Sequence, residues 1–255
     1  MKILLTNDDG FFAPGIAAFH RELKQLGNVI RIAPATEQSG VGHTITFLTP
    51  LIAHQAFDGD ELLGWTVEGS PADCVKLGVS ELCEGKPDLV VSGINGGLNA
   101  GINILYSGTV AGAIEGAFFG ITSVAVSLEF DERADFARAA KIAVSVIRQI
   151  LARKSGEPQL YNVNIPTVAT KETRDVRIVP MGVNRYGEHF DRRTDPKGRH
   201  YFWATNDPPP EPTDHETDLT ELSKGNITLT ALDYDMSKVT ELERMAGWNI
   251  KSPSL

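Results

Sequence analysis

The chain has 255 residues, of which 42% are hydrophobic and 22% are charged, a composition typical of folded globular proteins and unlike that of disordered, collagen-like or coiled-coil chains. Its 24 lysine and arginine residues are outnumbered by 33 aspartate and glutamate residues, which gives a formal net charge of -9. Such a charge disfavours a nucleic-acid polymer or an anionic membrane as a partner and favours a cation site.

The first two thirds of the chain alternate between short apolar runs, typical of buried strands, and longer amphipathic stretches, typical of helices. In chain order the pattern predicts a strand at 2–6, a helix at 16–26, a strand at 29–33, a hairpin formed by 44–53 and 62–67, a helix at 71–82, a strand at 89–92, a helix at 110–119, a strand at 121–128, a helix at about 132–153 and a strand at 160–165. This alternation predicts a three-layer α/β fold, doubly wound and Rossmann-like, with helices on both faces of a mostly parallel sheet.

The last third of the chain departs from this alternation. Basic and aromatic residues mix over 184–203, which predicts a hairpin arm, and in an acidic chain an oligomerisation arm or a substrate rim is favoured over a nucleic-acid face. Residues 206–221 hold four prolines and six acidic residues without a lysine or arginine, which predicts a solvated loop. A strand at 227–232 and a helix near 237–245 follow. We expect a single domain over 1–255, with a core at about 1–180 and with the hairpin arm and a C-terminal extension at about 181–255.

The compartment is indicated by the cysteines and by the N-terminus. Cys74 and Cys83 are the only cysteines, and their spacing is that of neither a metal site nor a redox pair, so we expect reduced structural thiols. The first apolar run covers only residues 3–5, which is too short for a signal peptide, and no later run is long enough to span a bilayer. The sequence therefore predicts a cytoplasmic protein.

Adjacent carboxylates, Asp8 and Asp9, follow the first predicted strand. In an open α/β sheet, ligands bind beyond the carboxyl ends of the strands where strand order reverses, and the loops that carry Asp8, Ser39 and Asn95 belong to that edge. Two neighbouring carboxylates repel each other unless they are protonated or bind a cation. The Ser39 hydroxyl and the Asn95 amide could complete an oxygen-rich shell for Mg²⁺, Mn²⁺ or Ca²⁺. The alternative is that the acidic pair only forms a turn with a helix cap.

The residues Ser107-Gly108-Thr109 precede a helix rich in small residues. Free backbone N–H groups, two hydroxyls and a glycine are the components of a phosphate cradle, although an ordinary helix cap has the same composition. The chain has no Walker A, G-x-G-x-x-G or G-x-S-x-G pattern, which excludes the usual fingerprints of nucleoside triphosphatases, dinucleotide enzymes and α/β-hydrolases. His43 follows Ser39 closely and is interpreted as a polar surface residue rather than a catalytic base.

Five blocks of the chain carry a resemblance to a known family, in the family's order and spacing. They are Ile3-Leu4-Leu5-Thr6-Asn7-Asp8-Asp9-Gly10, Ala33-Pro34 with Gln38-Ser39-Gly40, Ser70-Pro71-Ala72-Asp73-Cys74-Val75, Ser92-Gly93-Ile94-Asn95-Gly96-Gly97-Leu98-Asn99, and Tyr106-Ser107-Gly108-Thr109-Val110. The chain resembles the stationary-phase survival protein SurE family of metal-dependent 5'-nucleotidases and phosphatases. Weaker similarity continues to residues 225–230, so that the resemblance covers nearly the whole chain.

The resemblance implies an enzyme that hydrolyses nucleoside 5'-monophosphates to nucleoside and phosphate, with 3'-nucleotides and short polyphosphate as further candidate substrates. It implies that Asp8, Asp9, Ser39 and Asn95 hold a divalent metal, Mg²⁺ or Mn²⁺, in agreement with the donor set proposed above, and that Asp8 and Asp9 are catalytic. It also implies that Asn95, Asn99 and Ser107-Gly108-Thr109 border the phosphate and that the arm and the C-terminal extension form a homodimer or homotetramer. Gly96, Ala111-Gly112 and Ser70 depart from the commonest family residues, which bears on substrate preference more than on metal binding.

The expected chemistry is positioning and charge neutralisation. The metal would neutralise charge that develops during P–O cleavage, and the hydroxyls of Ser107 and Thr109 would hold phosphate oxygens. A metal-activated water or a carboxylate, Asp8 or Asp9, could attack the phosphorus, and both possibilities stay open. An alternative is a Mg²⁺-binding receiver-like regulatory domain, and a metal-dependent glycosyltransferase is a third candidate; the first lacks the expected phosphoacceptor aspartate and the second lacks a further acidic motif.

Overall fold

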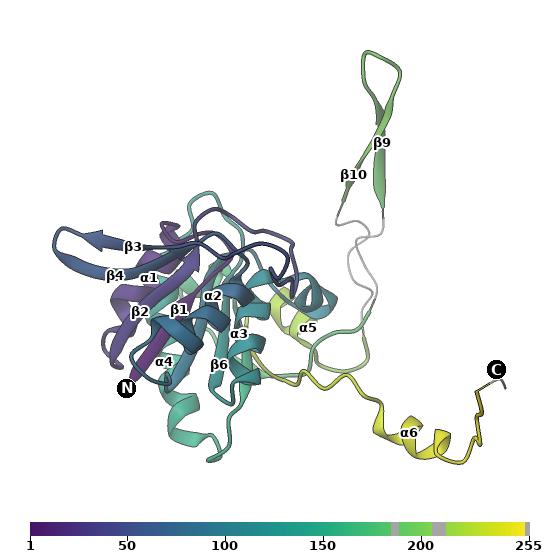
Figure 1. Cartoon of the computed structure of the whole chain (residues 1–255). Helices are drawn as coiled ribbons and strands as arrows, with labels where there is room; N and C mark the ends of the chain where they lie inside the picture. The colour runs from purple at the N-terminus through teal and green to yellow at the C-terminus, as the bar shows by residue number, and fades with distance from the viewer. Residues whose placement is uncertain (185–188, 206–212, 253–255) are drawn as a thin grey trace.

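The computed structural model describes residues 1–184, 189–205 and 213–252 (Figure 1). Nine of the strands in these residues form one sheet in the order β3-β4-β2-β1-β5-β6-β7-β11-β8. Their bounds are β1 Lys2–Thr6, β2 Asn28–Pro34, β3 Ala53–Asp58, β4 Glu61–Val67, β5 Leu89–Gly96, β6 Thr122–Leu128, β7 Leu160–Ile165, β8 Val176–Ile178 and β11 Ile227–Leu232. Only the β3–β4 and β7–β11 pairs are antiparallel, so the predicted mostly parallel sheet is confirmed.

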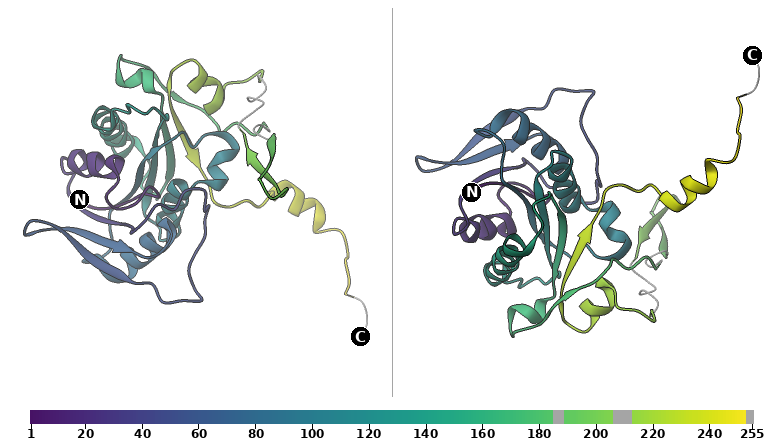
Figure 2. Two further views of the ribbon diagram at one scale, coloured as in Figure 1. Left: turned by 90° about the horizontal axis from the view of Figure 1, so that it is seen from above. Right: turned by 90° about the horizontal axis from the view of Figure 1, so that it is seen from below.

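Helices cover both faces of the sheet (Figure 2). Helices α1 (Pro14–Leu23) and α4 (Phe136–Arg153) pack side by side on one face, and α2 (Pro71–Leu77) and α3 (Gly108–Phe118) pack on the other. The alternation of side chains along β1 explains this arrangement, because Ile3 belongs to the apolar cluster under α1 and α4 whereas Leu4 belongs to the cluster under α2. The three-layer, doubly wound fold is therefore confirmed. No helix in the described part of the chain is long and apolar enough to cross a bilayer.

The order of the strands places the site. Strand β1 lies between β2 and β5, so the chain first proceeds outward from β1 through β2 and β4 and then returns to β5 on the other side. The loops that leave the carboxyl ends of β1 and β5 therefore diverge to opposite faces of the sheet. A gap between diverging loops of this kind is where ligands bind in open α/β folds.

Several helix bounds differ from the prediction for local reasons. Helix α1 ends at Leu23 and not at residue 26. Helix α4 begins at Phe136 rather than near residue 132, because the Asp135 carboxylate accepts a hydrogen bond from the Arg138 N–H at 2.8 Å and so caps the helix there. The helix expected at 71–82 ends its regular turns at Leu77 and continues as a wider helical turn over Gly78–Leu82.

The strand expected at 44–53 is wrong over residues 44–52, which form a loop. Its β-branched residues are typical of a strand, but two of its backbone groups bond to helix α2 and its cap instead of another strand. The N–H of Thr46 donates to Oδ1 of Asp73 at 2.9 Å, and the carbonyl of Thr44 accepts from the Ser70 hydroxyl at 2.6 Å. Strand β8 was not predicted, because its three residues give no alternation to detect.

The predicted hairpin arm is present as β9 (Phe190–Thr194) and β10 (His200–Ala204), an antiparallel pair that stands away from the sheet in Figure 1. Arg185 and Tyr186, which the prediction included, lie outside the described residues. The C-terminal segment with α6 (Val239–Met245) also leads away from the body. Large apolar side chains on both projections are exposed, with Trp203 at 60% and Leu242 at 54%.

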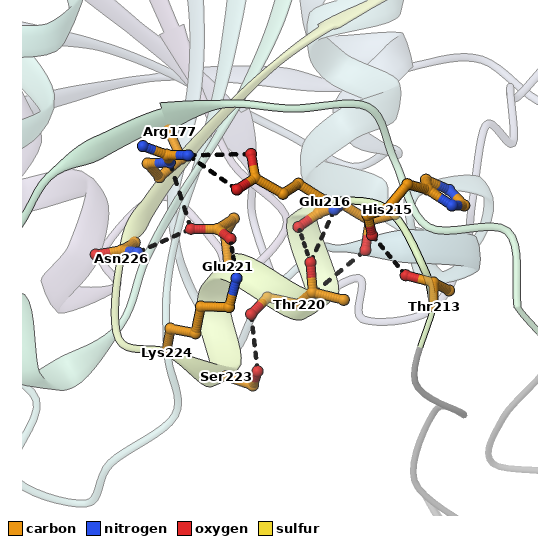
Figure 3. A network of polar contacts seen from close by, with 10 residues as sticks. Arg177, Thr213, His215, Glu216, Thr220, Glu221, Ser223, Lys224 and Asn226 are labelled. Atoms are coloured by element: carbon orange, nitrogen blue, oxygen red, sulfur yellow. Dashed lines mark hydrogen bonds and ion pairs between the residues drawn. The ribbon is translucent and has the colours of Figure 1, made fainter.

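Part of the expected acidic loop forms a short helix, in which a buried carboxylate accepts hydrogen bonds from neighbouring side chains. The prediction of a loop over 206–221 is wrong for the described residues 218–221, which belong to helix α5 (Asp218–Ser223), while residues 206–212 lie outside the described ranges. Figure 3 shows the buried Glu221 carboxylate accepting hydrogen bonds from Lys224 at 2.6 Å and Asn226 at 2.8 Å, with the Arg177 guanidinium 3.4 Å away. A buried carboxylate with such partners is stabilising.

One buried histidine makes the fold sensitive to acid. His20 in α1 is 4% exposed, and neither ring nitrogen has a hydrogen-bond partner among the described residues. Burial lowers the pKa of His20 to about 4, and the positive charge of Arg31 adds to the shift. Since the unfolded chain binds the proton near pH 6.5, the native state is fully favoured above that pH and loses stability as the pH falls towards 4.

We therefore expect acidification from pH 7.5 to 5 to cost the wild type about 2 kcal/mol more of its free energy of unfolding than it costs His20→Leu. Leucine has a similar size and no group to protonate. Urea unfolding of the two proteins at both pH values measures the difference, in which all other titrating groups cancel. Equal losses in the two proteins would exclude His20 as the acid-sensitive group.

Candidate active site

A cavity of about 750 Å³ opens at the carboxyl ends of β1 and β5. Six residues singled out from the sequence line it, and they come from four separate loops: Asp8, Asp9, Ser39, Asn95, Asn99 and Ser107. Gly108 and Thr109, the other two, begin helix α3 directly behind Asp8. The structure thus brings the predicted residues to one place, as the strand order requires.

Asp8 is the more deeply placed carboxylate of the acidic pair. It is 5% exposed, and the Thr109 hydroxyl donates a hydrogen bond to its Oδ1. Its backbone carbonyl accepts from the Gln38 N–H at 2.7 Å, which ties the loop of Ser39 to the end of β1. Burial raises the pKa of Asp8, and the hydrogen bond from Thr109 works against that rise.

Asp9 is less deeply buried than Asp8 and contacts the neighbouring strand β5. Its Oδ2 accepts a hydrogen bond from the Gly96 N–H at 3.3 Å, at the end of β5. Burial, followed by the negative charge of Asp8, raises the pKa of Asp9 to about 6, and Glu37 adds a smaller contribution in the same direction. The turn that presents both carboxylates is closed by Asn7, whose amide donates to the Gly10 carbonyl at 2.9 Å. The acidic pair is not a helix cap, because α1 starts at Pro14 without a side-chain cap.

The two remaining oxygen donors line the same cavity as the acidic pair, Ser39 from the loop after β2 and Asn95 from the end of β5. The Ser39 hydroxyl donates to Oε1 of Glu37 at 2.6 Å, so its lone pairs remain available to a cation. The Asn95 amide nitrogen donates to the Gly97 carbonyl at 2.6 Å, which leaves Oδ1 as its acceptor atom. Glu37 was not predicted as a site residue; its position two residues before Ser39 in a polar loop was the signal available.

The sequence left open whether Ser107-Gly108-Thr109 is a helix cap or a phosphate cradle, and the start of α3 has features of both. Ser107 is the N-cap, since its hydroxyl oxygen accepts the Val110 N–H at 3.1 Å, and it also lines the cavity, where its O–H can donate. The Thr109 hydroxyl is directed to Asp8 instead, which differs from the expected contact with a phosphate. Gly108 is required by packing, because a Cβ atom there would lie 2.9 Å from Cβ of Asp8.

Asn99 is fixed by a buried polar network. Its N–H donates to Oδ1 of Asn164 at 2.9 Å, and its carbonyl accepts from the side-chain amides of Asn162 and Asn164 at 2.8 and 3.0 Å. Its own amide donates to the Ser127 hydroxyl at 2.8 Å. Neither asparagine was predicted as a site residue, and both hold one cavity residue in place from β7.

His43 is exposed, as predicted for a polar surface residue, and it also makes defined contacts that were not predicted. Its Nε2 lies 2.9 Å from Oε2 of Glu115, a buried residue of α3, and its ring stacks on Phe118 with a centroid separation of 5.4 Å. The neighbouring Gly42 N–H donates to the carbonyl of Tyr106 at 3.0 Å. These contacts fasten the loop of Ser39 to the helix that carries Ser107. No signal in the sequence links residues 43 and 115.

The charge of the cavity indicates its ligand. Its described lining holds five carboxylates, those of Asp8, Asp9, Glu37, Asp131 and Glu132, and no lysine, arginine or histidine. No three His, Cys, Asp or Glu side chains within the described ranges form a metal-binding group. A mixed set of carboxylate, hydroxyl and amide oxygens is nevertheless the donor chemistry that Mg²⁺ and Mn²⁺ take, and a cation would relieve the repulsion between Asp8 and Asp9. The donor set therefore fits a divalent cation.

Comparison with known proteins gives a consistent result. Residues 3–188 match the family model described as "Survival protein SurE". A protein of Rhodopirellula baltica named "5'-nucleotidase SurE" is 54% identical, with 98% of this chain and 100% of that protein covered, and one of the same name from Syntrophobacter fumaroxidans is 39% identical with 98% and 100% covered. The crystal structure of the SurE protein from Aquifex aeolicus superposes with a TM-score of 0.85 at 37% identity, covering 98% of this chain and 100% of that one.

Proposed function

Since the chain belongs to the survival protein SurE family, we propose that it hydrolyses nucleoside 5'-monophosphates to nucleoside and phosphate. The observation that supports this most is the convergence of an acidic pair, further oxygen donors and a helix N-terminus on one cavity. The receiver-like alternative finds no support, because relatives over the full length are named 5'-nucleotidases and β5 presents Asn95 where a phosphoacceptor aspartate would be needed.

We further propose that Asp8, Asp9, Ser39 and Asn95 hold the divalent cation, Mg²⁺ or Mn²⁺. When bound, such a cation neutralises charge on the phosphoryl oxygens. The acidic cavity makes this necessary, because a dianionic phosphate entering it finds no cationic side chain in the described lining.

The protein's own groups would orient the phosphate. The Ser107 hydroxyl and the Gly108 N–H at the start of α3 can donate to phosphate oxygens, and the positive end of the helix dipole favours their negative charge. Asn99, held by its network, borders the same space. Thr109 acts on Asp8, whose Oδ1 it orients through its hydroxyl proton. Asp8 and Asp9 remain the proposed catalytic residues.

Metal dependence gives the test of the function. We expect phosphate release from AMP, GMP, CMP or UMP in the presence of Mg²⁺ or Mn²⁺, and a fall of at least about a hundredfold in excess chelator that reverses when metal is restored. Release that persists in chelator would contradict the metal proposal. No release from any of the four nucleotides, with a folded protein that binds the ion, would contradict the nucleotidase proposal.

We also propose that the chain forms a homodimer or homotetramer through the β9–β10 arm and the C-terminal segment. The support is the row of exposed apolar residues on both projections, including Phe202, Trp203, Leu242 and Ile250. Light scattering on the full chain gives the number of subunits. Hydrolysis of 3'-nucleotides or polyphosphate, and a cytoplasmic location, stay predictions.

A further inference from the structure

The cavity extends well beyond the residues assigned to the phosphate and the cation. Its volume of about 750 Å³ lies in the range of sites that bury a whole small molecule, about 300 to 1,000 Å³. Four apolar or aromatic residues also line it, Leu98, Tyr106, Phe130 and Phe136, and the part of the cavity that they line is called the outer part below. Tyr106 and Phe130 are largely exposed, and Phe136 is partly buried against the core. These side chains offer apolar surface to a second part of the ligand, beyond its phosphate.

The aromatic side of this outer part is built on a fixed loop between β6 and α4. The loop begins at Glu129, whose Oε2 accepts both the N–H and the hydroxyl of Thr167 at 2.8 Å, and it ends at the Asp135 cap of α4. Between them, Oδ1 of Asp131 accepts the Arg133 N–H at 2.7 Å and closes a turn. This loop holds Phe130 at the cavity with 73% of its surface exposed.

Phe136 brings the aromatic wall close to the acidic pair. A Cβ atom placed on Gly96 would lie 3.7 Å from Cζ of Phe136, and one placed on Gly15 would lie 3.2 Å from its Cε1. Gly96 is also the residue whose N–H binds Asp9 at 3.3 Å. Gly96 therefore lies between the Phe136 ring and the Asp9 carboxylate, which is proposed to hold the cation. A nucleotide whose phosphate lies beside that cation can reach the Phe136 ring with its base.

The polar groups beside the aromatic wall are acceptors. Glu132 lines the cavity, is exposed, and has no hydrogen bond or ion pair with any residue that the structure describes. A carboxylate only accepts hydrogen bonds. Guanine presents an N1–H and an amino group side by side, which suits one carboxylate, whereas uracil presents a single N3–H between two carbonyl oxygens, which a carboxylate repels.

We propose that the outer part of the cavity is a nucleobase subsite in which Phe130 and Phe136 supply stacking faces and Glu132 accepts the N–H groups of guanine, so that GMP is preferred to UMP. The inference rests on the proposed nucleotidase function and adds a base preference to it. Stacking of bases on aromatic side chains and hydrogen bonds to their Watson–Crick edges are the usual means of recognition.

The test compares GMP, UMP and ribose 5-phosphate, which has the phosphate and the sugar but no base, with Mg²⁺ present. We expect the ratio of kcat/KM for GMP to kcat/KM for ribose 5-phosphate to fall about tenfold in Phe130→Ala and in Glu132→Gln. The Glu132→Gln variant should also reduce the preference for GMP over UMP. Matched controls are Phe12→Ala, whose ring is 72% exposed outside the cavity lining, and Glu157→Gln.

Unchanged ratios in both variants, or an equal fall for GMP and ribose 5-phosphate, would overturn the subsite. Failure of the nucleotidase function is distinguishable, since the wild type would then release phosphate from neither compound. In that case calorimetry with guanosine and uridine still tests the subsite, which requires tighter binding of guanosine by the wild type and weaker binding by Phe130→Ala. Equal affinity for the two nucleosides would also overturn it.

Discussion

Replacing Asp9 by asparagine is expected to lower kcat/KM for a nucleoside 5'-monophosphate by at least about a hundredfold and at the same time to stabilise the metal-free protein. The expected loss of activity rests on the proposal that Asp9 gives the cation one of its anionic oxygens. The gain in stability follows from the raised pKa of Asp9, about 6, which shows that burial and the charge of Asp8 disfavour its charged form in the folded protein.

The sign of the stability change depends on pH. Well below pH 3.8 Asp9 is protonated in both the folded and the unfolded state and the substitution has little effect, whereas above pH 6 the folded protein carries the full penalty. At pH 7.5 in chelator we expect Asp9→Asn to raise the free energy of unfolding by roughly 1 to 2 kcal/mol. Asparagine keeps an oxygen that can accept the Gly96 N–H, so the contact with β5 persists.

Urea unfolding in chelator and phosphate release in Mg²⁺ measure the two effects on the same preparation. Asp60→Asn, in the exposed turn between β3 and β4, serves as the matched control and should change neither quantity. An active Asp9→Asn protein would remove Asp9 from the catalytic site. An inactive protein that is less stable than the wild type in chelator would show that Asp9 acts structurally.

The second large effect is expected from adding a single methyl group, in Gly108→Ala. The new Cβ would lie 2.9 Å from Cβ and 3.0 Å from Oδ2 of Asp8, well inside the carbon contact distance of about 3.5 to 4.0 Å. Asp8 must shift, and a displacement of about 1 Å in a catalytic site costs on the order of a hundredfold in rate. We expect kcat/KM to fall by about that factor in a protein that still folds.

In a helix interior, alanine is more stable than glycine by about 0.5 to 1 kcal/mol. Helix propensity therefore does not explain a loss of activity in Gly108→Ala. The control is Gly156→Ala, where the new Cβ would have no neighbour within 4 Å. Circular dichroism and a metal titration of phosphate release complete the measurement. Full activity in Gly108→Ala would show that the position of Asp8 is not critical.

The parallel core could be predicted from the sequence because buried strands leave continuous apolar runs and amphipathic stretches mark the helices between them. The loop at 44–52 could not, since its β-branched residues bond to Ser70 and Asp73 of the α2 cap, which only the folded chain brings near. The arm was predicted as a hairpin from mixed aromatic and basic residues, but its strand bounds depend on pairing between residues 190–194 and 200–204.

In the candidate site, too, some features could be predicted from the sequence and others could not. The order of the strands predicts that Asp8, Asp9 and Asn95 meet, because the two aspartates follow β1 and Asn95 lies at the carboxyl end of its neighbour β5. Where each hydroxyl proton is directed depends on side-chain rotamers and on distant partners. The Thr109 hydroxyl to Asp8 and the Ser39 hydroxyl to Glu37 are two examples that composition and spacing do not encode.

The acidic lining of the cavity also affects how charged ligands approach and leave it. A dianionic substrate that approaches a surface of like charge gains nothing from long-range attraction, so its capture would depend on close contact with the proposed cation and the start of α3. The same repulsion acts on a phosphate that leaves the cavity, so the lining slows the approach of a dianion and does not hold one back.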